Sequence, residues 1–321
     1  MEEIKTTNEF RNFEVVPHVS DHHFLNKSRD SITDNPNCRA HKRIMEEWET
    51  LEQNLPESIY VRVYKNRIDL MRAVIVGAAG TPYHNGLFFF DIAFPSNYPQ
   101  HPPMVNFTSS GLRLNPNLHV NGEVIMSLLS KSEIVEENCE TWDPSESTSL
   151  QVLLSLQKHI LNKEPFYNDP RAAYFRRFNM DGDSSRAYNE RVYSFTCHLT
   201  LYLMLNPPTD FKAFVIRHFC DRAPAILSAF KEYVNGSLSV ENYVRMSSLP
   251  VKVSPKFKEW VKDFYPLMFQ MFTLFGASFD ASFNSLELPS EPSESHNPGG
   301  IKKRGILPKL MKVIKSSFVL D

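Results

Sequence analysis

The side chains best suited to nucleophilic chemistry in this sequence are its four cysteines, at positions 38, 139, 197 and 220. A cysteine reacts as its thiolate, either alone or in closely spaced pairs that bind zinc or form disulfides. None of the four lies in a CxxC pair. The spacing therefore argues against a zinc site and against a disulfide framework, and scattered free thiols are typical of a reducing compartment.

A second candidate for chemistry is the segment at residues 112–129, LRLNPNLHVNGEVIMSLL, which is laid out like an active-site loop. It has turns at residues 115–117 (Asn-Pro-Asn) and 121–122 (Asn-Gly), and asparagine and glycine favour such turns. The short apolar segment 124–126 then leads into a Ser-Leu-Leu run. No residue at the position where chemistry is expected is a nucleophile, so the loop either lost a catalyst or never had one.

The bulk composition is that of an ordinary globular protein: 321 residues, 42% hydrophobic and 22% charged, with a net charge of −2. The length accommodates one large domain or about two of average size. The near-neutral charge gives no indication of nucleic-acid binding. The first ten residues, MEEIKTTNEF, are polar and acidic, unlike a signal peptide, and no apolar run approaches the roughly 18–20 residues of a membrane span. We therefore expect a cytoplasmic or nuclear protein with no transmembrane segment.

The elements that must position the loop at 112–129 are predicted by hydrophobic periodicity. A helix is expected at residues 38–54, where Ile44, Trp48 and Leu51 share one face. Four strand-like runs follow, and the short turns between them favour an antiparallel meander; they lie at 58–64, 70–77, 86–94 and 104–107. Helical patterns resume after the loop, at 147–162, 184–205, 208–234 and 254–275. This order of elements predicts an α+β fold.

Changes in composition divide the chain into five segments. Residues 1–37 form an N-terminal extension, either a flexible leader or partly ordered by its phenylalanines, and 38–170 form a core domain. Residues 171–283 form a helical C-terminal extension, 284–300 a Ser/Pro/Glu-rich linker and 301–321 a basic amphipathic tail. The tail has several possible roles: docking on the domain, binding a partner, contacting an anionic surface, or nuclear targeting.

The order of several motifs resembles the ubiquitin-conjugating enzymes (E2s). These motifs are Tyr-Pro-x-x-Pro-Pro at 98–103, Asn-Pro-Asn at 115–117 and Trp-x-Pro at 142–144, placed between a first helix and a crossover helix. The version with LNPNL is similar to a subgroup, the large E2/E3 hybrid-type enzymes and the plant phosphate-response E2s. Residues 164–168 (EPFYN) and 202–211 (YLMLNPPTDF) are also similar to that subgroup. The resemblance implies that 38–170 is an α+β E2 (UBC-like) core, with a four-stranded antiparallel meander flanked by helices.

The resemblance assigns chemistry to the loop at 112–129. An E2 carries ubiquitin as a thioester on a cysteine and passes it to an amine. In the family, the asparagine that ends the x-Pro-Asn turn donates a hydrogen bond to the oxyanion, and it corresponds to Asn117. The family nucleophile lies eight residues later, where this sequence has Ile125. Isoleucine has no lone pair and no ionisable proton, so Ile125 cannot form a thioester.

The remaining nucleophiles leave two functions open. Ser127 could carry at most an oxyester, while Cys139, in the polar loop at 130–141, is the candidate for a relocated nucleophile. Acidic neighbours of Cys139 disfavour its thiolate, and the other three cysteines are interpreted as packing residues. The leading hypothesis is an E2-like pseudoenzyme that binds or scaffolds without forming the ubiquitin thioester. The alternative is an active ubiquitin transferase that uses Cys139.

Asn115 and two groups of surface residues complete the comparison with the family. Asn115 stands where most E2s have histidine, although the subgroup also has asparagine there. The basic residues Arg39, Lys42 and Arg43 fit docking of the activating enzyme, and they also fit a solvated helix face. Many E2s carry an exposed aromatic residue for ligase docking where this sequence has Gln100 and His101. The expected partners are ubiquitin, an active E2, a ubiquitin ligase and the activating enzyme, and no cofactor, metal ion or nucleic acid is expected.

Overall fold

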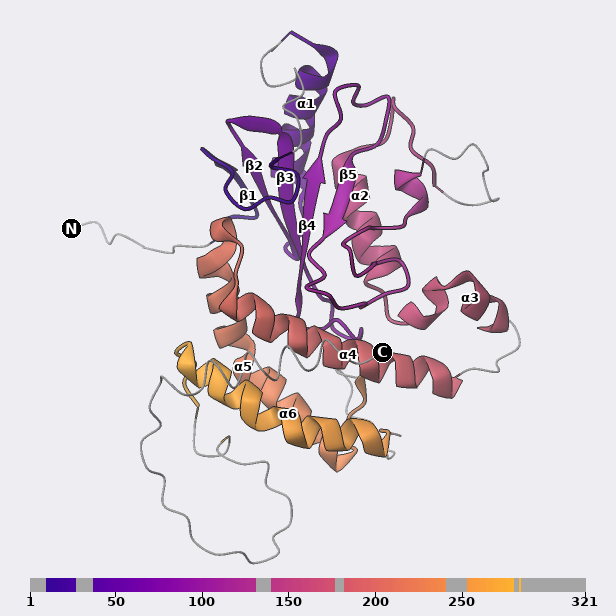
Figure 1. The fold of residues 1–321 in the computed structure, drawn as a ribbon, viewed down its shortest axis with the longest axis vertical. Coiled ribbons are helices and arrows are strands. Elements are labelled where there is room, and N and C mark those ends of the chain that lie inside the picture. Colours follow the sequence, from indigo (N-terminus) through magenta and orange to yellow (C-terminus); the bar gives the residue numbers. More distant parts are fainter. Residues whose placement is uncertain are drawn as a thin grey trace, which may run out of the picture.

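A five-stranded sheet lies at the centre of the molecule, with helices packed around it (Figure 1). The computed structural model describes residues 10–26, 37–130, 140–176, 182–240, 253–279 and 283. The strands are β1 (Phe13–Val16), β2 (Ile59–Tyr64), β3 (Arg67–Val76), β4 (Leu87–Ala93) and β5 (Met104–Phe107). The helices are α1 (Arg39–Asn54), α2 (Ser149–Ser155), α3 (Pro170–Arg176), α4 (Gly182–Leu205), α5 (Lys212–Asn235) and α6 (Pro255–Leu274). Short helical turns are η1 (Ser127–Leu129), η2 (Leu156–Ile160), η3 (Pro165–Asn168) and η4 (Thr209–Phe211).

The sheet has the order β1-β2-β3-β4-β5, and each neighbouring pair from β2 to β5 is antiparallel. This confirms the α+β fold and the antiparallel meander predicted from the sequence. The fifth strand, β1, lies in the segment interpreted as an N-terminal extension, and it pairs in parallel with β2, Phe13 opposite Val61. Four residues are too few to show a readable alternation of polar and apolar side chains, which is why the sequence did not reveal this strand.

The central strands are buried along their whole length. Every residue of β4 is buried, and so is every residue of β3 except the half-buried Val76. A strand that is covered on both faces needs no polar face, and this explains the continuous aromatic and apolar run at 86–94. The one carboxylate in β4, Asp91, accepts two hydrogen bonds from the guanidinium of Arg72 in β3, at 2.6 and 2.9 Å. This buried negative charge is therefore paired.

Helices α1 and α2 pack against each other and position the loops around the candidate site. Helix α1 begins after Cys38, whose Sγ accepts a hydrogen bond from the backbone N–H of His41 at 3.3 Å. Helix α2 begins after Thr148, which forms a reciprocal capping box with Gln151. The helix predicted at 147–162 continues through η2, a π-helical turn that ends at Ile160, with Leu161 as its C-cap.

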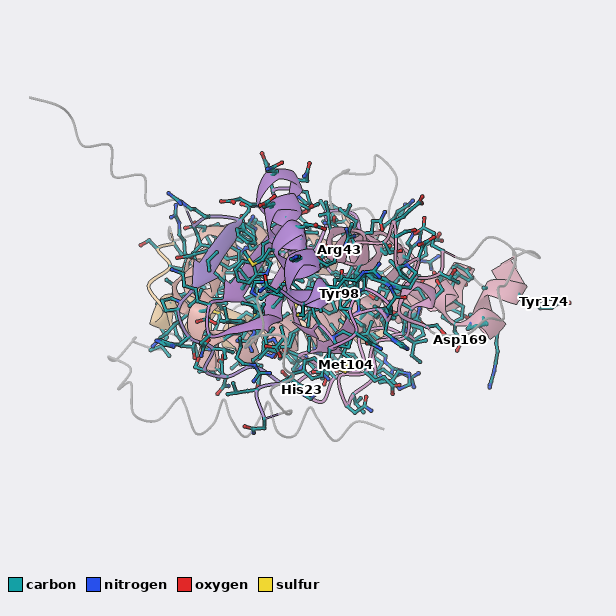
Figure 2. The ribbon with its side chains drawn as sticks, turned by 90° about the horizontal axis from the view of Figure 1, so that it is seen from above. His23, Arg43, Tyr98, Met104, Asp169 and Tyr174 are labelled. Carbon is teal, nitrogen blue, oxygen red and sulfur yellow. The ribbon has the colours of Figure 1, made fainter. Side chains whose placement is uncertain are left out.

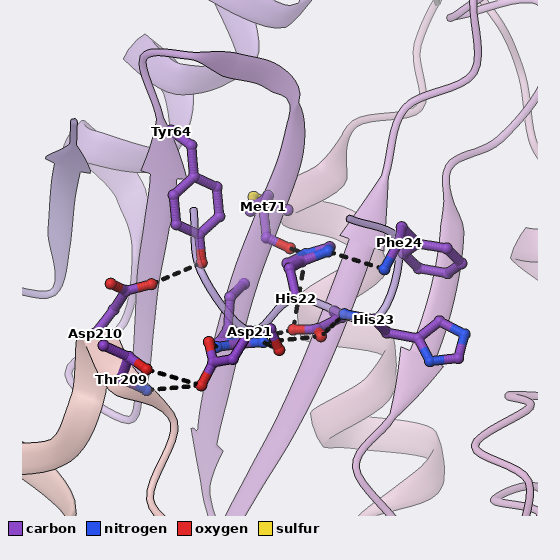
Figure 3. Close-up of polar contacts among 10 residues, drawn as sticks. Asp21, His22, His23, Phe24, Tyr64, Met71, Thr209 and Asp210 are labelled. Carbon is purple, nitrogen blue, oxygen red and sulfur yellow. Dashed lines mark hydrogen bonds and ion pairs between the residues drawn. The ribbon is translucent and has the colours of Figure 1, made fainter. Parts of the chain in front are cut away.

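Residues near Asp21 tie the sheet to the C-terminal helices (Figure 3). The carboxylate of Asp21 accepts a hydrogen bond from Arg72 at 2.6 Å and another from the backbone N–H of Thr209 at 2.9 Å. The hydroxyl of Tyr64 in β2 donates to Asp210, next to Thr209, at 3.0 Å. Asp21, which precedes α1, therefore links the buried Arg72 of the sheet to Thr209, which follows α4.

Helices α4, α5 and α6 pack on one another in the lower part of Figure 1. Aromatic contacts connect the three helices. The ring of Tyr193 in α4 contacts Phe230 and Tyr233 of α5 and Phe257 of α6. These helices match the predicted helical C-terminal extension. The predicted linker at 284–300 and tail at 301–321 lie outside the described residues. Within the described ranges, the structure has no helix that combines the length and the apolar character of a membrane span.

Candidate functional site

A tight hairpin places Asn117 directly opposite Ile125. The backbone N–H of His119 donates to the carbonyl of Glu123 at 2.9 Å, and the N–H of Ile125 donates to the carbonyl of Asn117, also at 2.9 Å. Two residues that are eight positions apart in the sequence therefore become neighbours in two extended segments, which an isolated β-bridge between Leu118 and Val124 joins. Any side chain at position 125 lies beside Asn117.

Gly122 closes this hairpin and attaches it to the sheet. Its φ is +89°, and a Cβ atom there would lie only 2.4 Å from Nδ2 of Asn106. Its carbonyl accepts a hydrogen bond from the N–H of Phe107 in β5 at 2.7 Å. Glycine adopts this conformation without strain and leaves room for the close approach. The position of the hairpin on the sheet therefore depends on this residue.

The buried side chain of Asn115 holds the turn that leads into Asn117. Its Oδ1 accepts a hydrogen bond from the N–H of Asn117 at 2.9 Å, which is the asparagine turn that such side chains form. Its Nδ2 donates to the hydroxyl of Tyr83 and to the carbonyl of Ile160, both at 2.8 Å. The residue is 0% exposed, so its amide has no access to solvent or to a ligand. Asn115 therefore supports the turn rather than presenting a reactive group.

The side chain at position 125 is apolar and open to solvent. Ile125 is 49% exposed, and Val120 at the tip of the hairpin is 55% exposed. Ser127, at the start of η1, is also exposed. Neither isoleucine nor valine has a nucleophilic atom, so these two side chains offer van der Waals contact and cannot attack a carbonyl carbon.

The three cysteines in the described residues serve packing and capping. Cys38 caps α1, Cys197 is buried in α4 and Cys220 is half-buried in α5. Burial raises the pKa of the Cys197 thiol, and burial together with Asp221 raises the pKa of the Cys220 thiol. A raised pKa keeps a thiol protonated and unreactive. Cys139, the predicted substitute nucleophile, lies outside the described residues.

The predicted docking residues of α1 divide into two exposed cations and one that serves the fold. Arg39 and Lys42 are exposed. Arg43 is half-buried, donates to the carbonyl of Ser147 at 3.1 Å, and has its Nε 3.3 Å from the carboxylate of Glu47. Arg39 and Lys42 are therefore the more accessible cations on this face, and Arg43 is partly exposed.

Glu47 organises this face, and the sequence reasoning did not identify it. The residue is 1% exposed and accepts hydrogen bonds from the hydroxyl of Tyr98 at 2.7 Å and from the backbone N–H of Ser149 at 2.8 Å. Tyr98 and Arg43 lie side by side at α1 in Figure 2. The available signal was that position 47 falls on the apolar face of the helical pattern, where a carboxylate must be paired.

Gln100 and His101 lie in the loop that Tyr98 anchors. Gln100 is exposed, whereas His101 is half-buried and contacts the side chain of Asn97. The indole N–H of Trp142 donates to the carbonyl of Pro99 at 2.7 Å and holds this loop against the segment before α2. Pro99 lines a surface hollow together with residues in or next to α1 and in or next to the Trp-x-Pro segment: Asn37, Arg39, Lys42, Arg43, Glu46, Pro144 and Ser145. The two predicted docking regions are therefore neighbours on one face.

Comparison with known proteins agrees with this architecture. The family model described as ubiquitin-conjugating enzyme matches residues 43–199. The probable ubiquitin-conjugating enzyme E2 24 of Arabidopsis thaliana is 39% identical over 269 residues, which cover 83% of this chain and 29% of that protein. The putative ubiquitin-conjugating enzyme E2 38 of the same plant is 42% identical over 228 residues, 71% of this chain and 69% of that protein.

A more distant relative is the human dual E2 ubiquitin-conjugating enzyme/E3 ubiquitin-protein ligase BIRC6. It is 34% identical over 242 residues, which cover 70% of this chain and 5% of that protein. On these matches the chain belongs to the ubiquitin-conjugating enzyme family. It spans 29% of E2 24 and 37% of the probable E2 25 of Arabidopsis thaliana, so it corresponds to part of these longer relatives.

Proposed function

We propose that this chain is an E2-type binding module that cannot carry ubiquitin as a thioester. The observation that supports the proposal best is the pairing of Ile125 with Asn117 in the hairpin. Position 125 lies eight residues after the Asn of the Asn-Pro-Asn turn, where the family nucleophile stands. A thioester needs a thiolate at that position, and no change of environment gives isoleucine a nucleophilic atom.

The parts of the site around Ile125 favour a binding role. Asn115 holds the turn before Asn117, and Gly122 packs closely against Asn106. Arg39 and Lys42 are exposed. Val120 and Ile125 both expose apolar side chains on this hairpin, and a protein partner could cover them. The proposed partners are ubiquitin, an active E2 and a ubiquitin ligase, with the activating enzyme as a further partner of the basic face. The cytoplasm or the nucleus is the proposed location.

A titration of isotope-labelled ubiquitin with the chain, and a parallel one with an active E2, tests the binding role. We expect chemical-shift changes that are confined to one face of the labelled protein and that saturate. The double variant Arg39→Glu/Lys42→Glu distinguishes binding at the basic face from binding at the hairpin. It should abolish contact with the activating enzyme and leave ubiquitin binding in place. The absence of any shift at high micromolar concentration would contradict the binding proposal and indicate a relic without partners.

The second candidate function is an active transferase that uses Cys139. It is supported by the presence of a thiol in the polar loop between the hairpin and Trp142. Incubation of the wild-type chain with activating enzyme, ATP and ubiquitin would then give a conjugate that thiols cleave, and Cys139→Ala would abolish it. If the conjugate persists in Cys139→Ala, this cysteine is not the carrier.

A further inference from the structure

A second asparagine, Asn168, reaches the turn that holds the candidate site. Its Nδ2 lies 3.3 Å from Oδ1 of Asn115 and 3.2 Å from the carbonyl of Ile160. Its own Oδ1 accepts a hydrogen bond from Nδ2 of Asn162 at 2.7 Å. Asn168 is the last residue of η3, in the EPFYN segment. A side chain 53 positions away therefore shares the oxygen of Asn115 that fixes the N–H of Asn117.

The contacts of Asn115 explain why an amide suits this position. An asparagine side chain offers two N–H donors and one oxygen with two lone pairs. Asn115 uses all four, because it donates to Tyr83 and Ile160 and accepts from Asn117 and Asn168. A neutral histidine offers one donor and one acceptor, so it would leave buried partners without hydrogen bonds. The amide of Asn168 therefore supplies the donor that the second lone pair of the Asn115 oxygen needs.

The helical extension holds Asn168 in place. Nδ2 of Asn189 in α4 donates to the carbonyl of Lys163, just before η3, at 3.1 Å. The rings of Phe166 in η3 and Tyr188 in α4 are 5.8 Å apart. A continuous set of contacts thus leads from α4 through η3 and Asn115 to the Asn117 backbone, which in turn bonds to the N–H of Ile125.

We propose that Asn168 is a positioning residue for the Asn117–Ile125 site, and that it acts through Asn115. The placement of η3 by α4 then sets the geometry of the hairpin. This inference rests on the proposed function, because it assumes that the loop around Ile125 retains the family geometry. Replacing the Asn168 amide by a carboxylate would put an acceptor against Oδ1 of Asn115 and the carbonyl of Ile160. The Asn115 amide would then rotate and release the N–H of Asn117.

Hydrogen exchange on the otherwise wild-type chain tests the coupling without any activity. In Asn168→Asp, we expect the Ile125 amide to exchange about tenfold faster, the effect of losing about one hydrogen bond. Amides of β3 such as Ile75 should change less than about twofold. Asn206→Asp is the matched control, because Asn206 is exposed and its Nδ2 donates to a local partner, the carbonyl of Tyr202. Unchanged exchange at Ile125 in a folded Asn168→Asp would overturn the proposal.

A double-mutant cycle distinguishes positioning from general stability. In the Ile125→Cys background, Asn168→Asp should slow discharge of the ubiquitin thioester to free lysine about tenfold, equivalent to about 1.4 kcal/mol. The same substitution should have no further effect once Asn117→Ala is present, because both act at one place. A slowing that persists in Asn117→Ala would show a merely structural role and overturn the proposal.

Two safeguards keep the test decisive. Asn168→Ala removes the donor without adding a charge, so it replaces Asn168→Asp if the acidic variant does not fold, and we expect the same direction. If Ile125→Cys cannot be charged at all, the proposed function loses its assumption of retained geometry. The exchange measurement still decides on its own whether Asn168 positions the hairpin.

Discussion

Arg43 and Glu47 lie one turn apart on α1, with the guanidinium Nε 3.3 Å from the carboxylate. The carboxylate also accepts hydrogen bonds from Tyr98 and Ser149. One buried acid therefore joins α1, the proline-rich loop and the start of α2. Arg43, one of the three basic residues predicted to bind a partner, therefore also supports the fold.

Glu47→Gln should lower the free energy of unfolding by about 2–4 kcal/mol, because the amide leaves buried donors unpaired and removes the buried counter-charge of Arg43. Glu46→Gln, at the preceding residue, is the matched control. Its side chain is 65% exposed and 3.5 Å from Arg43, so we expect a change within about 1 kcal/mol. Urea denaturation of both variants measures the difference. Equal losses would show that Glu47 is no more important to the fold than a surface carboxylate.

Gly122→Ala should destabilise the hairpin more than an ordinary substitution at a left-handed glycine. Gly276 provides the control, since its φ is +99° but a Cβ there meets no atom within 4 Å. Gly276→Ala should cost only the left-handed conformation, about 1–2 kcal/mol. Gly122→Ala adds the collision with Asn106 and Phe107, for a total of about 3 kcal/mol or more. Thermal unfolding compares the two, and indistinguishable midpoints would contradict the close approach of the hairpin to β5.

Stability should fall as the pH drops below neutrality, because histidines are buried in their neutral form. Nδ1 of His84 donates to the carbonyl of Thr81 at 2.7 Å, and Nε2 accepts from Tyr233 at 2.9 Å. Burial lowers the pKa of His84 to about 4 from 6.5. Below pH 6.5 the unfolded chain binds a proton that folded His84 does not take up until about pH 4, so stability is complete above pH 6.5 and decreases below it.

At pH 5 the loss from His84 should be about 2 kcal/mol relative to pH 7. Buried His22, His198 and His218 act in the same direction, because burial lowers the pKa of each. His84→Gln should therefore reduce the slope of the unfolding free energy against pH relative to the wild type. A slope that is identical in wild type and His84→Gln would contradict the buried neutral histidine.

The sequence predicted those parts of the fold that local patterns encode. The apolar run at 86–94 contains a fully buried strand. The three apolar residues Ile44, Trp48 and Leu51 of α1 face the hydrophobic core of the protein, as expected. The turns at 115–117 and 121–122 were also recognisable, since Asn, Pro and Gly have local conformational preferences. The family itself followed from the order of these motifs.

What sequence reasoning missed depends on contacts between distant residues. Strand β1 exists because residues 13–16 pair with β2, and nothing in a four-residue pattern indicates that partner. Glu47, unlike the exposed Glu46, falls on the apolar face of the helical pattern, but its partners Tyr98 and Ser149 come from distant segments that the pattern does not indicate. The pairing of Asn115 with Asn168 joins two motifs that were each recognised, but a single sequence does not reveal that they touch.

A charging assay tests most directly the claim that the residue at position 125 alone prevents this chain from carrying ubiquitin. The wild type, Ile125→Cys and Ser127→Cys are incubated with activating enzyme, ATP and ubiquitin and compared on gels with and without a reducing thiol. Ser127→Cys is the control for register, because it places a thiol two positions from the one opposite Asn117. We predict a thiol-sensitive conjugate for Ile125→Cys and none for the wild type or Ser127→Cys. A thiol-sensitive conjugate on the wild-type chain would contradict the claim.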